Sequence, residues 1–411
     1  MTLCSELADF EWLTGGEAGG LLYELVDDAG ELHTKIARLR ERLSQSRTHL
    51  LLEQVDLRRR ATAKFTHASR MFFTRTGLEQ ATDEWVAAYK ASRFTRQRAG
   101  SSSTPAGYAD LCCGIGGDLF ALSRRAGSVS ARSVSAIGID RDPIAALFAT
   151  ANTGAPVHAI DVADFDLSRI DAWHIDPDRR STGRRTTTLE YFQPDLATIE
   201  TLLARVPHAA VKLAPATKPP AEWIERCELE WISRDRECKQ LVAWHGNLAL
   251  MPGQHRATII TSTPAAGGSV PRTITGQPSQ SITLAHSVER FIFDIDPAVT
   301  AARLTGTLAA EHILRALAAG PTYLTGPRAI TTDAALACFE VEEVLPFRTR
   351  TLASLLRDRH IGQLEIKKRG VDTDPEKLRR DLKLRGDNAA TLLITLIAGR
   401  PTAILAKRVS P

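Results

Sequence analysis

The sequence lacks the features that mark several classes of protein. Its longest strongly apolar run, Ala389–Gly399, is far shorter than the ~20 residues that a transmembrane helix needs. The N-terminal segment carries acidic residues where a secretory signal peptide has basic residues before an apolar stretch. The six cysteines are scattered and match neither a disulfide framework nor the paired spacing of metal ligands. We therefore expect a cytoplasmic protein that spans no membrane and binds no metal.

The chain also has little net charge, but its charges are segregated. The formal net charge is +4 over 411 residues, and 43% of the residues are hydrophobic, which excludes intrinsic disorder. Residues 1–34 carry eight acidic and no basic side chains, whereas residues 35–100 carry an excess of nine positive charges. Residues 340–411 carry a further excess of five. Such a distribution suits an anionic polymer held by the regions that flank the centre, or an acidic leader that shields the basic helices.

The first hundred residues predict helices and no strand. Apolar residues recur at the i+3 and i+4 spacing of an amphipathic helix at Leu32, Ile36, Leu39 and Leu43. We expect further helices over residues 61–73 and 78–92, on either side of a break at 74–77. A Gly- and Ser-rich stretch at 100–107 has the composition of a flexible junction and ends this helical domain.

Beyond the junction, the pattern predicts an α/β domain. Short apolar runs alternate with helix-length segments at 108–112, 134–139, 157–160, 173–175 and 209–213. This alternation predicts βαβ units and a parallel sheet that is covered on both faces. Three strand-like runs follow at 229–233, 240–244 and 258–261, too close together for helical crossovers. They predict an antiparallel edge on the parallel sheet.

The tail of the chain predicts a second, smaller α/β region. A Ser-, Thr-, Gly- and Pro-rich stretch at 262–280 precedes it, and we expect a helix near 298–318 and a strand at 338–344. The end of the chain predicts a βαβ-like unit and a further strand, over 362–367, 375–383, 391–397 and 402–406.

A glycine-rich turn follows the first predicted strand of the α/β domain. Asp110 is followed by Gly114, Gly116 and Gly117, with the spacing D-x-x-x-G-x-G-G, and a helix begins after them. Glycines allow close approach of a ligand to the main chain, and a helix N-terminus offers free N–H groups. The dinucleotide fingerprint G-x-G-x-x-G fails, because Leu119 stands where its third glycine belongs.

This turn resembles motif I of the class I S-adenosylmethionine-dependent methyltransferases, which have a Rossmann-like fold. The resemblance implies that the strand-end acid Asp110, with the glycine loop, holds the methionine part of S-adenosylmethionine. It also implies that Asp140, at the end of the second strand, binds the ribose hydroxyls. A carboxylate suits this task because it accepts hydrogen bonds from two neighbouring hydroxyls. After the third strand, the resemblance places Asp161 and Val162 at the adenine.

The residues that we expect to bind the cofactor are Asp110, Cys112, Gly114, Gly116, Gly117, Asp140, Asp161 and Val162. The adjacent Cys112 and Cys113 are typical of small buried residues and not of nucleophiles.

The end of the fourth predicted strand faces the methyl group if the domain is doubly wound. It reads Asp176-Pro-Asp178-Arg179-Arg180. Methylases of amino groups carry Asp/Asn-Pro-Pro-aromatic here, so this sequence keeps Asp-Pro but lacks the aromatic residue. Asp176 is the first candidate for orienting or deprotonating the nucleophile, and Asp178 is the second. Arg179 and Arg180 could hold a phosphate or carboxylate of the substrate, or pair with Asp178 in a solvated loop.

Two more residues near the strand ends have an open interpretation. Lys212 lies within the apolar fifth strand, where an amine is costly unless it reaches solvent or a carboxylate. A lysine that extends to solvent and a lysine of the site fit this pattern equally. His174 precedes Asp176 by two positions, and a hydrogen-bonded core histidine is the favoured interpretation.

From about residue 60 to its end, the chain resembles one bacterial group, the class I methyltransferases with a C-terminal THUMP-like domain. The strings that carry the resemblance are Lys64-Phe65, Thr74-Arg75 to Ala81-Thr82, Asp110–Asp118, Asp140–Pro143, Asp176–Arg180, Val211–Leu213, Tyr323–Gly326, Val344–Phe347, Leu364–Asp372 and Arg385–Asn388. Apolar spacing and composition predict the helical N-terminal domain over 1–100. With the resemblance, we expect a methyltransferase domain over 101–268, a connecting module over 269–339 and a THUMP-like domain over 340–411.

THUMP domains are similar to RNA-binding modules of RNA-modifying enzymes, so the resemblance implies an RNA substrate, rRNA or tRNA. Lys367, Lys368 and Arg369 follow a predicted strand and are candidates for phosphate contact, together with the bases of the helix at 375–383. The acids interleaved with them also fit a solvated helix. A methyltransferase acting on a small molecule or a protein, and a non-catalytic RNA-binding protein, stay open as alternatives.

Overall fold

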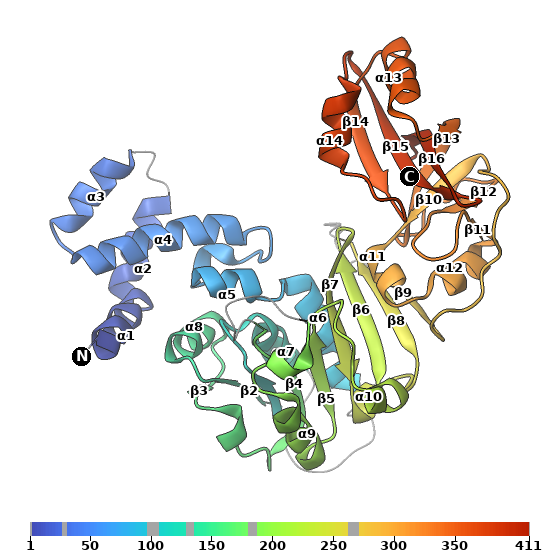
Figure 1. The fold of residues 1–411 in the computed structure, drawn as a ribbon. Coiled ribbons are helices and arrows are strands. Elements are labelled where there is room, and N and C mark those ends of the chain that lie inside the picture. The colour runs from blue at the N-terminus through green and yellow to red at the C-terminus, as the bar shows by residue number, and fades with distance from the viewer. Residues whose placement is uncertain are drawn as a thin grey trace. The chain divides into compact units, whose positions relative to one another are not determined.

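The computed structural model describes residues 2–26, 31–96, 107–128, 135–179, 187–261 and 271–410 (Figure 1). The chain divides into two compact units. The first comprises Met1–Cys227 and Val242–Pro252, and the second comprises Glu228–Leu241 and Gly253–Pro411. Most of the predicted junction at 100–107 lies outside the described residues. In the described part of the chain, no helix is both long and apolar enough to cross a membrane.

The first unit begins with helices, as the sequence predicts. They are α1 (Thr2–Leu13), α2 (Gly16–Val26), α3 (Leu32–Arg40), α4 (Gln45–Ala61), α5 (Arg75–Gln80) and α6 (Glu84–Arg96). Their apolar side chains form one core with Phe148 of α8 (Pro143–Thr153) and with Ile115 of the glycine-rich turn. The helical part therefore packs directly against the turn.

The predicted bounds of two helices are wrong. Residues 61–73 form only a short 3₁₀ turn at Ala68–Arg70. The reason is that side chains of α4 hold the backbone of the extended residues beyond this turn. Gln54 bonds both the N–H and the carbonyl of Phe73, and Arg58 bonds the carbonyl of Met71.

The predicted helix at 78–92 is two helices, and the predicted break before it is a helix start. The side chain of Thr74 caps α5 by accepting a hydrogen bond from the N–H of Gly77. The chain then leaves the helical conformation at residues 81–83 before α6 begins. Lys64 donates to the carbonyls of Leu78 and Ala81, which ends α5 there.

The sheet of the first unit is parallel. Its strands are β1 (Gly107–Leu111), β2 (Ser135–Asp140), β3 (Val157–Ala159), β4 (Ile170–Ile175) and β5 (Ala209–Leu213), in the order β3-β2-β1-β4-β5. The connections between them contain α7 (Gly117–Ser128), α8 and α9 (Leu196–Arg205), and α10 (Ala221–Arg226) follows β5. Every residue of β1 and β5 is buried, as expected for strands covered on both faces. The carboxyl ends of all five strands lie at one edge of the sheet.

The second unit contains β6 (Glu228–Arg234), most of β7 (Glu237–Trp244), β8 (His255–Ile260) and β9 (Arg272–Gly276), in the order β7-β6-β8-β9. A two-residue turn, with both φ angles positive, joins β6 to β7 as an antiparallel hairpin. β6 and β7 are thus antiparallel as predicted, but β8 pairs with β6 in parallel. β9 is antiparallel to β8 and lies within the stretch at 262–280, where the sequence predicts no strand.

A seven-stranded sheet forms the rest of the second unit. Its strands are β10 (Phe291–Ile295), β11 (Arg315–Ala316), β12 (Leu324–Gly326), β13 (Leu336–Pro346), β14 (Ile361–Lys368), β15 (Asn388–Ile397) and β16 (Arg400–Arg408). The predicted helix near 298–318 is wrong. Two helices, α11 (Pro297–Ala301) and α12 (Thr305–His312), are separated by Arg303 with a φ of 59°, and β11 follows them.

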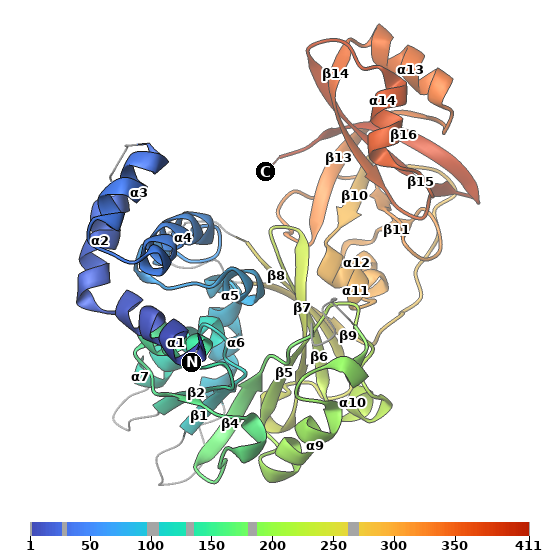
Figure 2. The ribbon, with the colours of Figure 1, turned by 60° about the vertical axis from the view of Figure 1, so that its left-hand side comes forward.

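The end of the second unit contains the predicted βαβ unit. β14, α14 (Pro375–Leu382) and β15 form it, and the two strands are parallel. α13 (Thr349–Asp358) packs beside α14 on one face of the sheet (Figures 1 and 2). Both helices bury leucines there and turn their polar sides outward.

Candidate functional site

The glycine-rich turn joins β1 to α7 through backbone conformations that favour glycine. Gly114 has a φ of 54° and Gly116 a φ of 87°, both in the left-handed region. α7 begins at Gly117, so its N-terminal N–H groups lie at the end of the turn. Cys112 has a φ of 55° and is half-buried. Burial and the nearby Asp140 raise the pKa of its thiol well above the ordinary value, which makes it a poor nucleophile.

The three glycines of the turn differ in their surroundings. A Cβ at Gly116 would stand 2.8 Å from the methyl of Thr153, and a Cβ at Gly117 would stand 2.9 Å from the carbonyl oxygen of Thr82. A Cβ at Gly114 would have nothing within 4 Å. Gly116 and Gly117 are therefore required by packing within the protein, whereas Gly114 faces open space that a ligand can use.

Asp140 lies at the carboxyl end of β2 and closes the turn. Its Oδ2 accepts from the N–H of Gly114 at 2.8 Å, and its Oδ1 accepts from the N–H of Asp142 at 2.9 Å. Burial raises the pKa of the Asp140 carboxyl above its ordinary value, and these two backbone bonds oppose that rise. The structure thus brings Asp140 and the glycine turn together, as the sequence predicts.

The two residues after β3 take up different positions. Asp161 is exposed and caps a short 3₁₀ helix, Val162–Asp164, by accepting from the N–H of Ala163 at 2.9 Å. Val162 is 5% exposed and belongs to the core. The adjacent strand, β2, carries Asp140 at its end, so Asp161 follows the neighbouring strand at the same edge of the sheet.

Asp110 lies beneath the turn instead of at its surface. Its side chain is 1% exposed, and its Oδ1 accepts from Nδ1 of His174 at 2.7 Å. Its Oδ2 is buried without a hydrogen-bond partner. Burial raises the pKa of the Asp110 carboxyl, and the contact with His174 opposes the rise. His174 is thus a hydrogen-bonded core histidine, as expected.

A chain of buried polar contacts continues from His174. The ammonium of Lys90 on α6 donates to Nε2 of His174 at 3.0 Å and pairs with Oδ1 of Asp118 at 2.7 Å. The hydroxyl of Thr82 donates to Oδ2 of Asp118 at 2.7 Å. Lys90 is 2% exposed, and burial lowers the pKa of its ammonium. Burial opposes ionisation of Asp118, but the charge of Lys90 outweighs it, so the pKa of that carboxyl is low.

The chain of contacts ends at Asp176, after β4. Lys212 on β5 donates to Oγ1 of Thr82 at 3.1 Å and pairs with Oδ2 of Asp176. Lys212 is therefore buried against a carboxylate and does not extend to solvent. Sequence reasoning did not find Lys90 or Asp118. A signal exists for Lys90, because it lies among the apolar residues of α6 at the spacing of the buried helix face.

The structure describes two of the three remaining candidates after β4, Asp178 and Arg179. Asp178 exchanges two backbone hydrogen bonds with Gln193, and its Oδ1 lies 3.4 Å from Nε2 of Gln80. Arg179 is half-buried. Arg180 lies outside the described residues.

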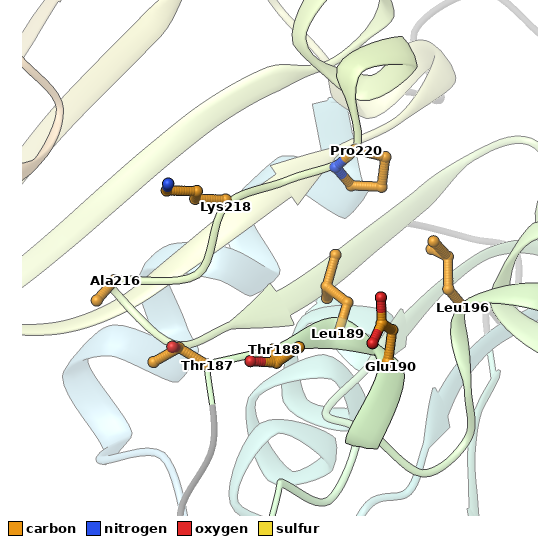
Figure 3. Close-up of a pocket in the computed structure, with 8 residues that line it drawn as sticks. All are labelled: Thr187, Thr188, Leu189, Glu190, Leu196, Ala216, Lys218 and Pro220. Carbon is orange, nitrogen blue, oxygen red and sulfur yellow. The ribbon is translucent and has the colours of Figure 1, made fainter.

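A pocket of about 480 Å³ opens beyond the carboxyl ends of β4 and β5 (Figure 3). The residues that line it follow these two strands: Thr187, Thr188, Leu189, Glu190, Leu196, Ala216, Lys218 and Pro220. None of these side chains is aromatic. In open α/β sheets, ligands bind at this edge, and pockets of small-molecule sites have roughly this volume.

The predicted phosphate-binding cluster of the second unit is partly used within the protein. Arg369 donates to Oδ1 of Asp294 at 2.7 Å, and Lys367 lies 3.3 Å from the other oxygen. Asp294 is 6% exposed, and although burial opposes it, the pairing with Arg369 lowers the pKa of its carboxyl. Lys368 is exposed on the helix side of β14. The three residues thus lie together, but only Lys368 is directed to solvent.

Comparison with known proteins identifies the family. An uncharacterized S-adenosylmethionine-dependent methyltransferase of Mycobacterium tuberculosis strain H37Rv is 32% identical over 366 residues, which cover 84% of this chain and 92% of the relative. The chain belongs to the S-adenosylmethionine-dependent methyltransferases. S-adenosylmethionine is therefore its cofactor. Residues 336–408 match the family described as THUMP domain-like.

The crystal structure of a protein from Porphyromonas gingivalis W83, described as a methyltransferase, has the same fold as this methyltransferase. Its TM-score is 0.71, with 21% identity, and the match covers 99% of this chain and 98% of that one. The α/β fold class with a methyltransferase sheet is confirmed. The open space at Gly114 and the carboxylate of Asp140 beside it suit a cofactor with a ribose and a charged amino acid end.

Proposed function

We propose that this methyltransferase acts on structured RNA, either rRNA or tRNA, in the cytoplasm. The observation that carries the proposal is the THUMP domain-like match at residues 336–408, because THUMP domains accompany RNA-modifying enzymes. The charge of the same region supports it. Residues 340–411 have an excess of five positive charges, which suits contact with phosphates.

The exposed cations of this region are a candidate RNA-binding surface. The following exposed side chains form no ion pair with any residue that the structure describes: Arg348, Arg350, Arg357, Lys368, Lys377, Arg380, Lys383, Arg385, Arg400 and Lys407. Arg350, Arg357, Lys377 and Arg380 lie on α13 and α14, which cover one face of the sheet. We assign this helical face to the RNA.

The cofactor is assigned to the edge of the sheet in the first unit. We assign the ribose hydroxyls to Asp140, the adenine to Asp161 and Val162, and the methionine part to the turn from Cys112 to Gly117. The open space at Gly114 supports this assignment. Asp110, which is buried against His174, would support the turn from beneath. When bound, the cofactor supplies an electrophilic methyl group.

The methyl acceptor is assigned to the end of β4. Asp176 is the first candidate for orienting the nucleophile, because its side chain is 25% exposed at the carboxyl edge of the sheet. Asp178 and Arg179 follow it, and we assign Arg179, with Arg180, to the substrate. Alignment of nucleophile and methyl group supplies much of the rate enhancement in such reactions, so the protein's main task is positioning.

One observation favours a second candidate, a methyltransferase of small molecules. The pocket beyond β4 and β5 has the volume of a small-molecule site, and among the described residues no aromatic side chain lines it to stack on a base. In that case the cationic face of α13 and α14 would serve another purpose.

The salt dependence of RNA binding tests the RNA proposal. We expect the apparent affinity for total rRNA or tRNA to fall steeply with salt, by about 0.7–0.9 powers of the salt concentration per phosphate contacted. The double variant Lys377→Glu/Arg380→Glu should reduce this slope and the affinity. A matched control is Lys239→Glu, a surface lysine on β7 outside the proposed face. RNA binding that does not depend on salt contradicts the proposal. So does an equal affinity of the double variant and of Lys239→Glu for RNA.

A further inference from the structure

Lys212 and Asp176 lie side by side at the carboxyl edge of the sheet. In the parallel pair of β4 and β5, Ile175 is in register with Val211. The residues that follow them, Asp176 and Lys212, therefore lie next to each other. The side chain of Lys212 is 8% exposed and that of Asp176 is 25% exposed. The ammonium of Lys212 pairs with Oδ2 of Asp176. A buried ammonium therefore holds one oxygen of the partly exposed carboxylate.

The position of Lys212 is itself determined by its second partner. Thr82 donates its only hydroxyl proton to Asp118 at 2.7 Å, so its oxygen lone pairs are left to accept from Lys212 at 3.1 Å. Asp118 is held in turn by Lys90 at 2.7 Å. Lys90, Thr82 and Lys212 thus each donate to a defined acceptor, and the ammonium of Lys212 is fixed between Thr82 and Asp176.

The pairing leaves the other oxygen of Asp176 available. Among the described residues, Oδ1 of Asp176 has no hydrogen-bond partner, whereas Oδ2 is taken by Lys212. We propose that Lys212 is a positioning residue, which fixes Asp176 so that its Oδ1 accepts a hydrogen bond from the group that is methylated. This inference rests on methyl transfer by this site, but it does not require the acceptor to be RNA.

The arrangement selects the chemical class of the acceptor. A carboxylate oxygen attracts a nucleophile with an N–H or O–H donor and repels a thiolate or a carboxylate. The acceptor is therefore an amine, an amide-like ring nitrogen or a hydroxyl. In the transfer, a lone pair of that N or O forms the bond to the methyl carbon while the carbon–sulfur bond breaks toward sulfur. The proton of the acceptor passes to Oδ1 of Asp176 and then to water.

Substitutions of Lys212 test the inference. Purified variants are incubated with tritiated S-adenosylmethionine and an extract of a deletion strain, and label is counted in the RNA, protein and small-molecule fractions. Lys212→Met should lower the rate at saturating cofactor by about 100-fold, the cost of a misplaced catalytic group. The KM for the cofactor should stay within about threefold, because the cofactor is assigned to other residues. Lys212→Arg, which keeps a cationic donor, should retain at least about a tenth of the wild-type rate.

A second pair of variants covers the case that Lys212→Met does not fold. Thr82→Val removes the acceptor that orients Lys212 but keeps the side-chain shape, and it should lower the rate about tenfold. Thr82→Ser keeps the hydroxyl and should lower it much less. Lys239→Met is a surface control. If Lys212 had a purely structural role, its variants would lower the stability of the protein and its cofactor affinity, both measured by calorimetry. The rate and the KM for the cofactor would then change together.

The outcomes separate this inference from the RNA proposal. Label that enters RNA, at a rate about 100-fold lower with Lys212→Met, supports both. Label in RNA that Lys212→Met leaves within about threefold of the wild-type rate overturns the inference alone. Label in protein or small molecules overturns the RNA proposal, and the same variants then decide the inference in that fraction. Equal loss in Lys212→Met and Lys212→Arg also overturns it. Absence of label from every fraction with the wild-type protein overturns both.

Discussion

Replacing Lys90 with methionine should destabilise the first unit strongly. The side chain is 2% exposed, and its ammonium pairs with Asp118 at 2.7 Å and donates to His174 at 3.0 Å. Methionine fills a similar volume but leaves Asp118 as a buried carboxylate, for which the hydroxyl of Thr82 is the only remaining close donor among the residues that the structure describes. Breaking a buried ion pair by removing one partner costs about 3–5 kcal/mol.

Hydrogen exchange of the backbone amides of β1 and β4 measures this loss within the sheet itself. A loss of about 3–5 kcal/mol corresponds to exchange that is faster by roughly 100- to 5,000-fold. The double variant Lys90→Met/Asp118→Leu should recover much of the stability, because it removes both charges together. Exchange in Lys90→Met within about tenfold of the wild type refutes the reasoning. So does a double variant no more stable than the single one.

Four further predictions concern the turn and the acids. Gly116→Ala should lower the stability by about 1–3 kcal/mol in chemical denaturation, because its φ is positive and its Cβ would be crowded. Gly114→Ala, where a Cβ meets open space, should cost less stability but weaken calorimetric binding of S-adenosylmethionine. Asp140→Ala should abolish that binding, and unchanged binding contradicts the assignment. The low pKa of Asp294 contributes stability that is complete above its unfolded pKa of about 3.9 and is lost at lower pH, so Asp294→Asn should flatten the acid limb of a pH–stability profile.

The sequence predicted the sheet of the first unit well because buried parallel strands have a strong signal. β1 and β5 are buried at every residue and apolar except for Asp110 and Lys212, and each strand is separated from the next by a helix-length segment. The strand-end acid Asp140 and the glycine turn follow from local sequence, because both lie next to a strand end. Their contact at 2.8 Å is a consequence of the parallel pairing of β1 and β2.

The helix bounds near residue 70 could not be predicted because the deciding contacts are distant in sequence. The side chain of Asn152 on α8 accepts from the N–H of Phe72 at 2.7 Å and donates to its carbonyl at 3.0 Å. It also donates to the carbonyl of Ile115 in the glycine turn at 2.9 Å. These bonds satisfy an extended backbone that apolar spacing alone assigns to a helix.

The buried polar chain was only partly visible in the sequence. Period-2 alternation puts His174 and Asp176 on one face of the strand, and the in-register pairing of β1 with β4 places Asp110 beside His174. Lys90 and Asp118 enter this row from two helices, α6 and α7, whose packing cannot be read from the strands. Sequence reasoning therefore finds the residues on the sheet and misses their partners on the helices.

The nucleosides of cellular RNA provide the most direct test of the central claim. Mass spectrometry of rRNA and tRNA is compared between the wild-type strain, a deletion strain, and deletion strains that carry either the wild-type gene or Asp140→Ala. We expect one methylated nucleoside to be missing after deletion, to return with the wild-type gene and to stay missing with Asp140→Ala. Methylated nucleosides that are identical in all four strains contradict the claim that this methyltransferase acts on RNA.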